Sequence, residues 1–275
     1  MIRSMYSAVT GLKGHQTMLD VIGNNIANVN TVGFKSSRVL FKDLYYQTLS
    51  ASSDPSETNG GTSPQQIGYG ASVSSIDVLA TRSGYQQTGR PLDMYISGEG
   101  YFAMQDSSGR ELYTRVGSFK FNPNGTLVDT NGNFVLGSMP TYNEGDTPGV
   151  LKIEDFNKYT GIYIASNGKI VGTNTETKQI DTLAQITLST FSNPEALSQE
   201  GDMYYSITNS SGEAQFATPD STTAGALVSG GLEMSNVDLT KEFTDMIVAQ
   251  RGFQANSRVI TTSDHVLEEL VNLKR

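Results

Sequence analysis

The stretch LTKEFTDMIVAQRGFQANSRVITTSDHVLEEL, residues 239–270, determines how the C-terminal end of this chain folds. Its apolar residues recur every seven positions, and the series comprises Leu239, Met246, Phe253, Ile260 and Leu267. A seven-residue step held over five positions is typical of a helix that packs along its length against other helices. We therefore predict a long helix with Phe243 beside this stripe. Asn236 or Asp238 is suited to cap its start, because a short side-chain oxygen accepts hydrogen bonds from free backbone N–H groups.

The N-terminal end carries a second apolar series with the same step. Its members are Met5, Leu12, Leu19 and Ile26, with Val9 beside them. Either series alone is compatible with an amphipathic helix packed on its own domain. The occurrence of one series at each end favours two terminal helices that form a coiled-coil-like domain.

The sequence between the two ends has a different character. Residues 47–72 are dominated by Ser, Thr, Gly, Pro and Gln, which bury too little apolar surface to order independently, and we predict a flexible Ser/Gly-rich connection there. Residues 73–231 contain short alternating runs and Asn-Gly pairs typical of strands and hairpins, and their last part, 210–231, is again predicted to be flexible. The predicted strands are VSSIDVL (73–79), LDMYI (92–96), YFAMQ (101–105), ELYTR (111–115), SFKF (118–121) and QITLSTF (185–191).

These patterns together predict an α+β fold with three parts. Residues 1–46 and 232–275 are assigned to a terminal helical domain, residues 47–72 to the connection, and residues 73–231 to a mainly β domain.

Composition excludes several classes of function. The chain has 275 residues, 37% of them hydrophobic, which is enough for a real core. Its net charge of -9 argues against binding nucleic acid or anionic lipid through a basic face. Apolar runs are too short to predict membrane insertion, and the N-terminus lacks the apolar core of a secretory signal. If the protein leaves the cytoplasm, we expect export without a cleaved signal peptide.

The sequence offers no clear constellation for catalysis, for a cofactor or for a metal. Both histidines, His15 and His265, fall within the predicted helices, and there is no cysteine. Residues 129–133, DTNGN, resemble the start of a calcium loop, but the position of the bidentate glutamate is occupied by Pro140, so we favour an Asn-Gly turn. We expect no enzymatic activity. A carbohydrate-processing or metal-dependent enzyme and a monomeric β-rich adhesin remain the alternatives from other classes.

Four asparagines cluster where the N-terminal helix is expected to end. The segment IGNNIANVNTVGFK, residues 22–35, contains short amides that bond nearby backbone, a glycine suited to a left-handed turn and a phenylalanine that anchors the exit. These residues are Asn24, Asn25, Asn28, Asn30, Gly33 and Phe34.

Three segments of the chain resemble one bacterial protein family. NNIANVNTVGFK resembles the N-terminal signature of flagellar rod and hook proteins. LDMYISGEGYFAMQ and YTRVGSFKFNPNGTLVDTNGNFVLG are similar to the β domain of that family, and the segment from residue 232 to the end resembles its C-terminal helix. Within the family the short form of the hook protein is the best match, and the distal rod protein, a drive shaft, is the alternative.

The resemblance implies a structural subunit that is exported through the flagellar apparatus and polymerises outside the cell. A hook subunit would form a tubular joint that transmits torque, with its terminal helices around a central export channel. Its expected partners are copies of itself, the distal rod protein, the hook cap, the hook-filament junction proteins and the export apparatus. We expect the terminal segments to stay mobile until other copies cover an apolar polymerisation seam made of Met5, Val9, Leu12, Leu19, Ile26, Leu239, Phe243, Met246, Phe253, Ile260 and Leu267.

Overall fold

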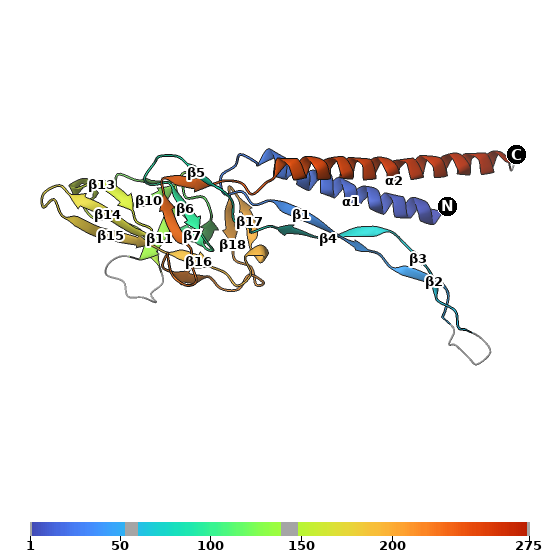
Figure 1. Cartoon of the computed structure of the whole chain (residues 1–275), viewed down its shortest axis with the longest axis horizontal. Coiled ribbons are helices and arrows are strands. Elements are labelled where there is room, and N and C mark those ends of the chain that lie inside the picture. The colour runs from blue at the N-terminus through green and yellow to red at the C-terminus, as the bar shows by residue number, and fades with distance from the viewer. Residues whose placement is uncertain (1, 53–59, 139–147, 274–275) are drawn as a thin grey trace. The chain divides into compact units, whose positions relative to one another are not determined.

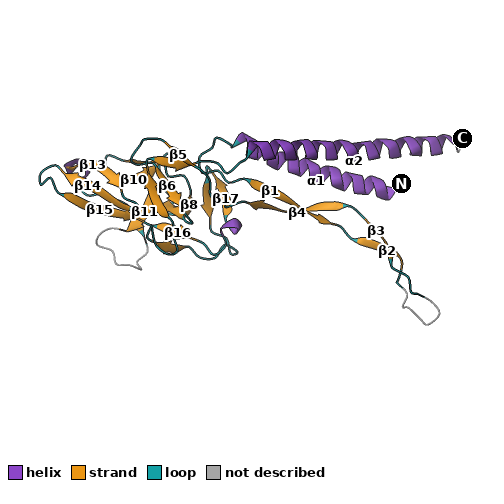
Figure 2. Ribbon diagram, viewed as in Figure 1, coloured by secondary structure: helices purple, strands orange, loops and turns teal. Residues whose placement is uncertain are grey.

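Two compact units make up the chain in the computed structural model, which describes residues 2–52, 60–138 and 148–273. Unit 1 holds both long helices (purple in Figure 2), and unit 2 is built mainly from strands. Unit 1 comprises residues 1–29, 36–79 and 237–275. Unit 2 comprises residues 30–35 and 80–236.

Unit 1 pairs two antiparallel helices, α1 (Ile2–Ala27) and α2 (Leu239–Leu273), which lie side by side in Figure 1. Asp238 caps α2, because its Oδ1 atom accepts hydrogen bonds from the backbone N–H groups of Thr240 at 2.9 Å and Lys241 at 3.4 Å. Of the two predicted caps, Asp238 is therefore the one used.

A pair of two-stranded antiparallel sheets completes unit 1. Strand β1 pairs with β4 next to α1, and β2 pairs with β3 (Figure 1). The four strands are β1 (Ser37–Asp43), β2 (Tyr46–Ser50), β3 (Gln65–Gly68) and β4 (Ala71–Val78). A lone two-stranded ribbon is marginally stable in water, so the exposed β2 and β3 strands gain little from their own pairing.

Unit 2 contains one large sheet of 13 described strands and two small sheets of two strands each. All the strand pairs are antiparallel. The small sheets are β6 (Met94–Ser97) with β20 (Ala226–Ser229), and β5 (Tyr85–Gln87) with β21 (Gly231–Glu233). The large sheet contains β7 (Tyr101–Gln105), β8 (Glu111–Thr114), β9 (Phe119–Phe121), β10 (Leu127–Asp129), β11 (Phe134–Ser138), β12 (Gly149–Val150), β13 (Tyr159–Ile164), β14 (Lys169–Asn174), β15 (Ile180–Ile186), β16 (Leu188–Thr190), β17 (Ser198–Gly201), β18 (Tyr204–Ser206) and β19 (Gln215–Ala217).

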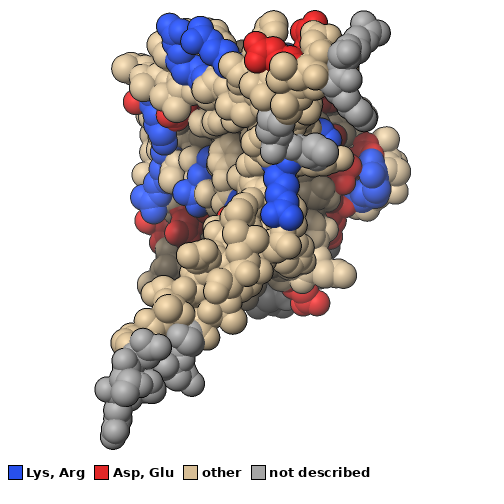
Figure 3. Space-filling model, turned by 90° about the vertical axis from the view of Figure 1, so that its right-hand side faces the viewer, with Lys and Arg blue, Asp and Glu red and all other residues tan. Residues whose placement is uncertain are grey.

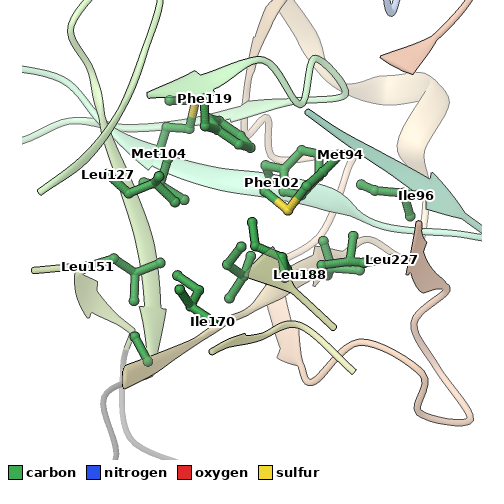
Figure 4. Close-up of a cluster of buried hydrophobic side chains, with 14 of the residues drawn as sticks. Met94, Ile96, Phe102, Met104, Phe119, Leu127, Leu151, Ile170, Leu188 and Leu227 are labelled. Atoms are coloured by element: carbon green, nitrogen blue, oxygen red, sulfur yellow. The ribbon is translucent and has the colours of Figure 1, made fainter. Parts of the chain in front are cut away.

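The main core of unit 2 lies between these strands. Figure 4 shows side chains from both ends of the unit 2 sequence meeting there, among them Met94, Phe102, Leu188 and Leu227. The rings of Phe102 and Phe119 pack edge to face, with their centroids 5.1 Å apart. The core therefore draws on strands from both ends of residues 94–227.

The predicted helices at both ends and the mainly β centre are present, so the α+β class is confirmed. A coiled-coil supercoil is not established by the structure. The boundaries differ from the expected ones. Within 1–46 the helix ends at Ala27 and β1 follows, and β4 belongs to unit 1 rather than to the β domain.

Strands also occupy parts of both segments for which the sequence predicts flexibility. Strand β3, most of β2 and the start of β4 lie within 47–72, and strands β19, β20 and part of β21 lie within 210–231. In 210–231 the pairing partners explain the difference, because they lie outside the segment, whereas β2 and β3 pair with each other. Strand β19 pairs with β16, and β20 with β6, which is far away in the sequence. Local composition does not reveal a partner at that distance.

The segment DTNGN forms a turn. The Gly132 N–H donates to the Asp129 carbonyl at 3.1 Å, and strands β10 and β11 flank the turn. The buried Asp129 carboxylate accepts a 2.5 Å hydrogen bond from the Tyr204 hydroxyl. The Asp129 Oδ2 atom is therefore engaged in a hydrogen bond inside the protein. Pro140 lies outside the described residues.

Candidate self-assembly surface

The contact between α1 and α2 is close because small residues line it. An added Cβ atom on Gly11 would lie 2.7 Å from the Asn256 Nδ2 atom, and one on Gly252 would lie 2.5 Å from the His15 ring. Ala249 is fully buried. The facing pairs are Gly11 with Asn256, His15 with Gly252, and Asn25 with Glu242, and in each pair the two residue numbers sum to 267. The helices therefore keep one antiparallel register along their contact.

The buried line along these helices repeats every seven residues, as the sequence predicts, but it runs three positions beyond the predicted series. On α2 it passes through the buried Glu242 and Ala249 and the half-buried Asn256, and on α1 through the buried Ala8 and Ile22 and the half-buried His15. The predicted seam therefore lies beside the intrachain contact. Four of its members are exposed, namely Val9, Leu239, Phe243 and Phe253. The others are half-buried, namely Met5, Leu12, Leu19, Ile26, Met246, Ile260 and Leu267.

The exposed apolar surface of unit 1 extends beyond the predicted seam. On α1, Tyr6 is 66% exposed, and on α2, Ile247 and Val248 are 59% and 58% exposed. The β2 and β3 strands add Tyr46 and Ile67. Extended exposed apolar surface is more typical of proteins that bind another macromolecule than of monomeric ones. We call the exposed apolar residues of α1 and α2 the helical surface.

Among the four clustered asparagines, Asn25 forms hydrogen bonds that connect separate secondary-structure elements. Its amide Nδ2 donates to the Ser37 carbonyl at 2.8 Å, and its Oδ1 atom accepts from the Ser37 N–H at 3.0 Å. The same Nδ2 donates to the Glu242 Oε1 atom at 3.2 Å. Asn25 therefore connects the end of α1, the start of β1 and the first turn of α2 within unit 1.

The other asparagines act locally. The Asn28 amide donates to the Asn24 carbonyl at 3.0 Å and to the Asn24 Oδ1 atom at 2.6 Å, at the last turn of the helix. Asn30 is exposed in the turn that follows. These contacts lie where the helix ends, and such local side-chain hydrogen bonds compete with continued helical pairing.

Gly33 and Phe34 shape the exit from this turn. Gly33 has a φ of 72°, and its N–H donates to the Glu233 carbonyl at 2.8 Å. A Cβ atom there would approach the Val116 Cγ2 atom to 2.9 Å, so glycine is required by both conformation and space. Phe34 is buried and lines a cavity of about 210 Å³ together with Met203 and Tyr204.

The first turn of α2 contains a buried carboxylate. Burial raises the pKa of Glu242 above its usual value, the hydrogen bond from Asn25 acts in the opposite direction, and nearby Asp245 adds to the increase. Keeping Glu242 ionised in this contact therefore costs free energy.

A buried ionic cluster that the sequence does not reveal lies in unit 2. The Lys35 Nζ atom is 2.5 Å from the Glu233 Oε1 atom, and the Arg115 Nη1 atom is 3.4 Å from Oε2 of the same carboxylate. All three side chains are at most 4% exposed. Lys35 also donates to the Thr81 carbonyl at 2.8 Å. No periodicity marks these residues, because they converge from three distant segments.

Burial lowers the pKa of the Lys35 ammonium, while Glu233 raises it and Arg115 lowers it further. Two cationic groups thus share one buried carboxylate. The arrangement fixes residues 30–35 against β21 and the segment after residue 80, and it has the properties of a structural anchor rather than of a reactive centre.

Three models of flagellar protein families match the chain. The model described as flagella basal body rod protein matches residues 5–35, the flagellar hook protein FlgE/F/G D1 domain matches residues 95–172, and the flagellar basal body rod FlgEFG protein C-terminal matches residues 228–273. These segments contain most of α1 with the asparagine cluster, part of unit 2, and α2.

Relatives match along the entire chain. The flagellar basal-body rod protein FlgG of Bacillus subtilis is 49% identical over 277 residues, with both chains fully covered. The flagellar basal-body rod protein FlgG of Borreliella burgdorferi is 36% identical over 278 residues, again with full coverage of both chains. The flagellar hook protein FlgE of the same organism is 28% identical over an alignment of 444 residues, which also covers both chains fully.

Proposed function

This chain belongs to the flagellar rod and hook protein family, and we propose that it is a subunit of the basal-body rod that assembles with copies of itself through the helical surface. As a member of this family it is an axial structural protein of the flagellum, and its relatives are structural proteins rather than enzymes. Our proposal concerns two points, namely that the chain is located in the rod rather than the hook, and that copies of it contact one another through the helical surface.

The sequence identities to rod proteins support assignment of this chain to the rod rather than to the hook. The relatives named as rod proteins align over about the length of this chain, whereas the alignment with the hook protein is far longer than its 275 residues. Within Borreliella burgdorferi the rod protein is also the more similar of the two, at 36% against 28%. These observations favour the alternative over the hook assignment that the sequence suggests.

The uncovered apolar side chains of α1 and α2 are the observation that supports self-assembly. Phe243, Ile247 and Val248 are each at least half exposed on one helix. Burial of such side chains against another copy contributes about 1 to 2 kcal/mol each. Partners among other axial proteins and the export apparatus are expected from the family alone. For contact with further copies of itself, the chain also presents a surface, namely the helical surface.

The helices and the surface charges of the protein provide two further observations. Among the described residues, no helix has the length and apolar character needed to cross a bilayer. The face in Figure 3 carries basic and acidic side chains separated by larger areas of uncharged residues. A mixed surface of this kind is compatible with packing against copies of the same chain.

Sedimentation over a range of protein concentrations tests self-assembly. We expect the wild-type chain to form regular polymers above a critical concentration, and Phe243→Gln with Val248→Gln to raise that concentration at least about tenfold, since each change removes apolar contact area. Ile180→Gln, at an exposed residue of unit 2, is the matched control. Wild-type protein that stays monomeric at every soluble concentration would contradict the proposal.

Labelling of isolated hook-basal bodies distinguishes the two axial positions. A small affinity tag on this chain, detected by gold particles in electron microscopy, should mark the rod within the basal body. Label along the hook would show that the hook assignment is the correct one.

A further inference from the structure

The helix α2 extends beyond its partner in the same chain. The register of the two helices places Ile2, the first residue of α1, level with His265. Residues 266–273 of α2 therefore run past the end of α1 by about 12 Å, at 1.5 Å per residue. We call these eight residues the overhang.

The overhang continues the line that packs against α1, but with larger apolar side chains. The buried line through Glu242, Ala249 and Asn256 reaches Leu270 after two more seven-residue steps. Leu270 is 48% exposed, and Val271 next to it is 65% exposed. Nothing within the described part of unit 1 covers this apolar face.

Acidic side chains border the apolar face of the overhang. Asp264, Glu268 and Glu269 are all exposed, and residues 264–273 contain no lysine or arginine. Lys274 and Arg275 follow in the sequence, outside the described residues. A surface that complements the overhang should therefore be apolar at its centre and basic at its edges.

The outer face of α1 has that character. Tyr6 and Val9 are exposed there, at 66% and 40%, and the exposed Arg3 and Lys13 lie one turn before and one turn after them. The spacing of these four residues places them on one side of the helix. The overhang cannot reach this face in its own chain, because Val9 is level with residue 258, which lies about 18 Å along α2 from Leu270.

We propose that the overhang of one copy packs on the outer face of α1 in a second copy, with Leu270 and Val271 against Tyr6 and Val9. The acidic residues of the overhang then lie near Arg3 and Lys13 of the second copy. This inference rests on the proposed self-assembly and specifies which two surfaces meet. Because every copy carries both surfaces and the two differ, the contact is directional and propagates from copy to copy.

Cysteine cross-linking tests this contact directly, since the chain has no cysteine of its own. Under mild oxidation Val9→Cys with Leu270→Cys should give a ladder of covalent oligomers. The reaction is carried out on polymers, in which the helices are ordered as a pair. A bond within one chain is excluded there, because the two positions lie about 18 Å apart along α2 and a disulfide needs Cα atoms within about 7 Å of each other. Val9→Cys with Ile180→Cys is the matched control. Polymers that yield no more cross-linked product than this control would overturn the contact.

Charge reversal gives an independent test with its own rescue. Glu268→Lys with Glu269→Lys should raise the critical concentration about tenfold, and so should Arg3→Glu with Lys13→Glu, because exposed ion pairs contribute about 0.2 to 1 kcal/mol each. All four changes together keep the net charge of -9 and should restore assembly. A quadruple variant with normal helix content and no rescue would refute the pairing.

The failure of this inference is distinguishable from the failure of the proposed function. Wild-type polymers that are unaffected by either pair of reversals leave self-assembly intact and remove only the proposed contact. A wild-type chain that never polymerises removes both.

Discussion

Asn25 and Glu242 are 217 positions apart in the sequence, yet the Asn25 amide donates a 3.2 Å hydrogen bond to the Glu242 carboxylate. Both side chains are buried where α1 ends and α2 begins. The same amide group pairs with both backbone polar groups of Ser37. One residue therefore determines how three elements of unit 1 meet.

Replacement of Asn25 should destabilise unit 1 strongly. In Asn25→Ala the Ser37 backbone groups and the Glu242 carboxylate lose their partner inside the protein, and unsatisfied buried polar groups cost about 1 to 3 kcal/mol each. We expect a loss of about 3 kcal/mol in the free energy of unfolding, measured by denaturant titration of helical circular dichroism. Asn30→Ala, at an exposed position of the same cluster, is the control and should change stability by less than about 0.5 kcal/mol. Equal effects of the two variants would refute the role of Asn25.

Glu242 should make unit 1 less stable as the pH rises. Its pKa in the folded chain lies above the value in the unfolded chain, so the folded state binds the proton more tightly. The stabilisation is fully present below the pKa of Glu242 in the unfolded chain and is lost as the pH rises through its higher pKa in the folded chain. We expect Glu242→Gln to remove this part of the pH dependence and to stabilise the helices at neutral pH. A pH profile of unfolding that is identical in both proteins would contradict this assignment.

Glu233 should matter more than Lys35 for the stability of unit 2. Glu233→Gln leaves Lys35 and Arg115 buried without their carboxylate, whereas Lys35→Met leaves Glu233 paired with Arg115. Removing one partner of a buried ion pair costs about 3 to 5 kcal/mol, and we expect this loss for Glu233→Gln and a clearly smaller one for Lys35→Met. Near-ultraviolet circular dichroism of the tyrosines during denaturation gives the comparison. The reverse order would show that Lys35 and not Glu233 is central to the cluster.

The position at which the C-terminal helix is removed should decide whether unit 2 survives. A chain without residues 237–275 keeps Glu233 and the whole of unit 2, and we expect it to fold but not to polymerise. A chain without residues 232–275 loses Glu233 and most of β21, and it should fold poorly. Proteolysis and circular dichroism measure folding, and sedimentation measures assembly. Tubes formed by the first truncated chain would contradict the role of α2.

The terminal helices should be mobile in the isolated chain and ordered in the polymer. The helical surface leaves Phe243 and Val248 in contact with water, so the pair gains only part of its packing energy before assembly. Amide hydrogen exchange should therefore show weak protection of residues 239–267 in the monomer and strong protection in the assembled form. Strong protection in a soluble monomer would be evidence against this prediction.

The sequence by itself determined the features that depend on local repetition. The seven-residue steps predict both long helices, YFAMQ matches β7 residue for residue, and the asparagine cluster marks the end of α1. Each of these signals is contained in a short window, because the helical and strand periods repeat within a few residues.

Only the tertiary structure decided which residues from distant windows meet. It placed the helix contact three positions from the predicted series, paired β2 with β3 in a segment of flexible composition, and gathered Lys35, Arg115 and Glu233 around one buried carboxylate. Small residues such as Gly11 permit the close approach of the helices, whereas the larger side chains of the predicted seam remain outside it. The physical reason is that burial and electrostatic pairing depend on neighbours far away in the chain, and no local pattern of residue types encodes which neighbour will be near.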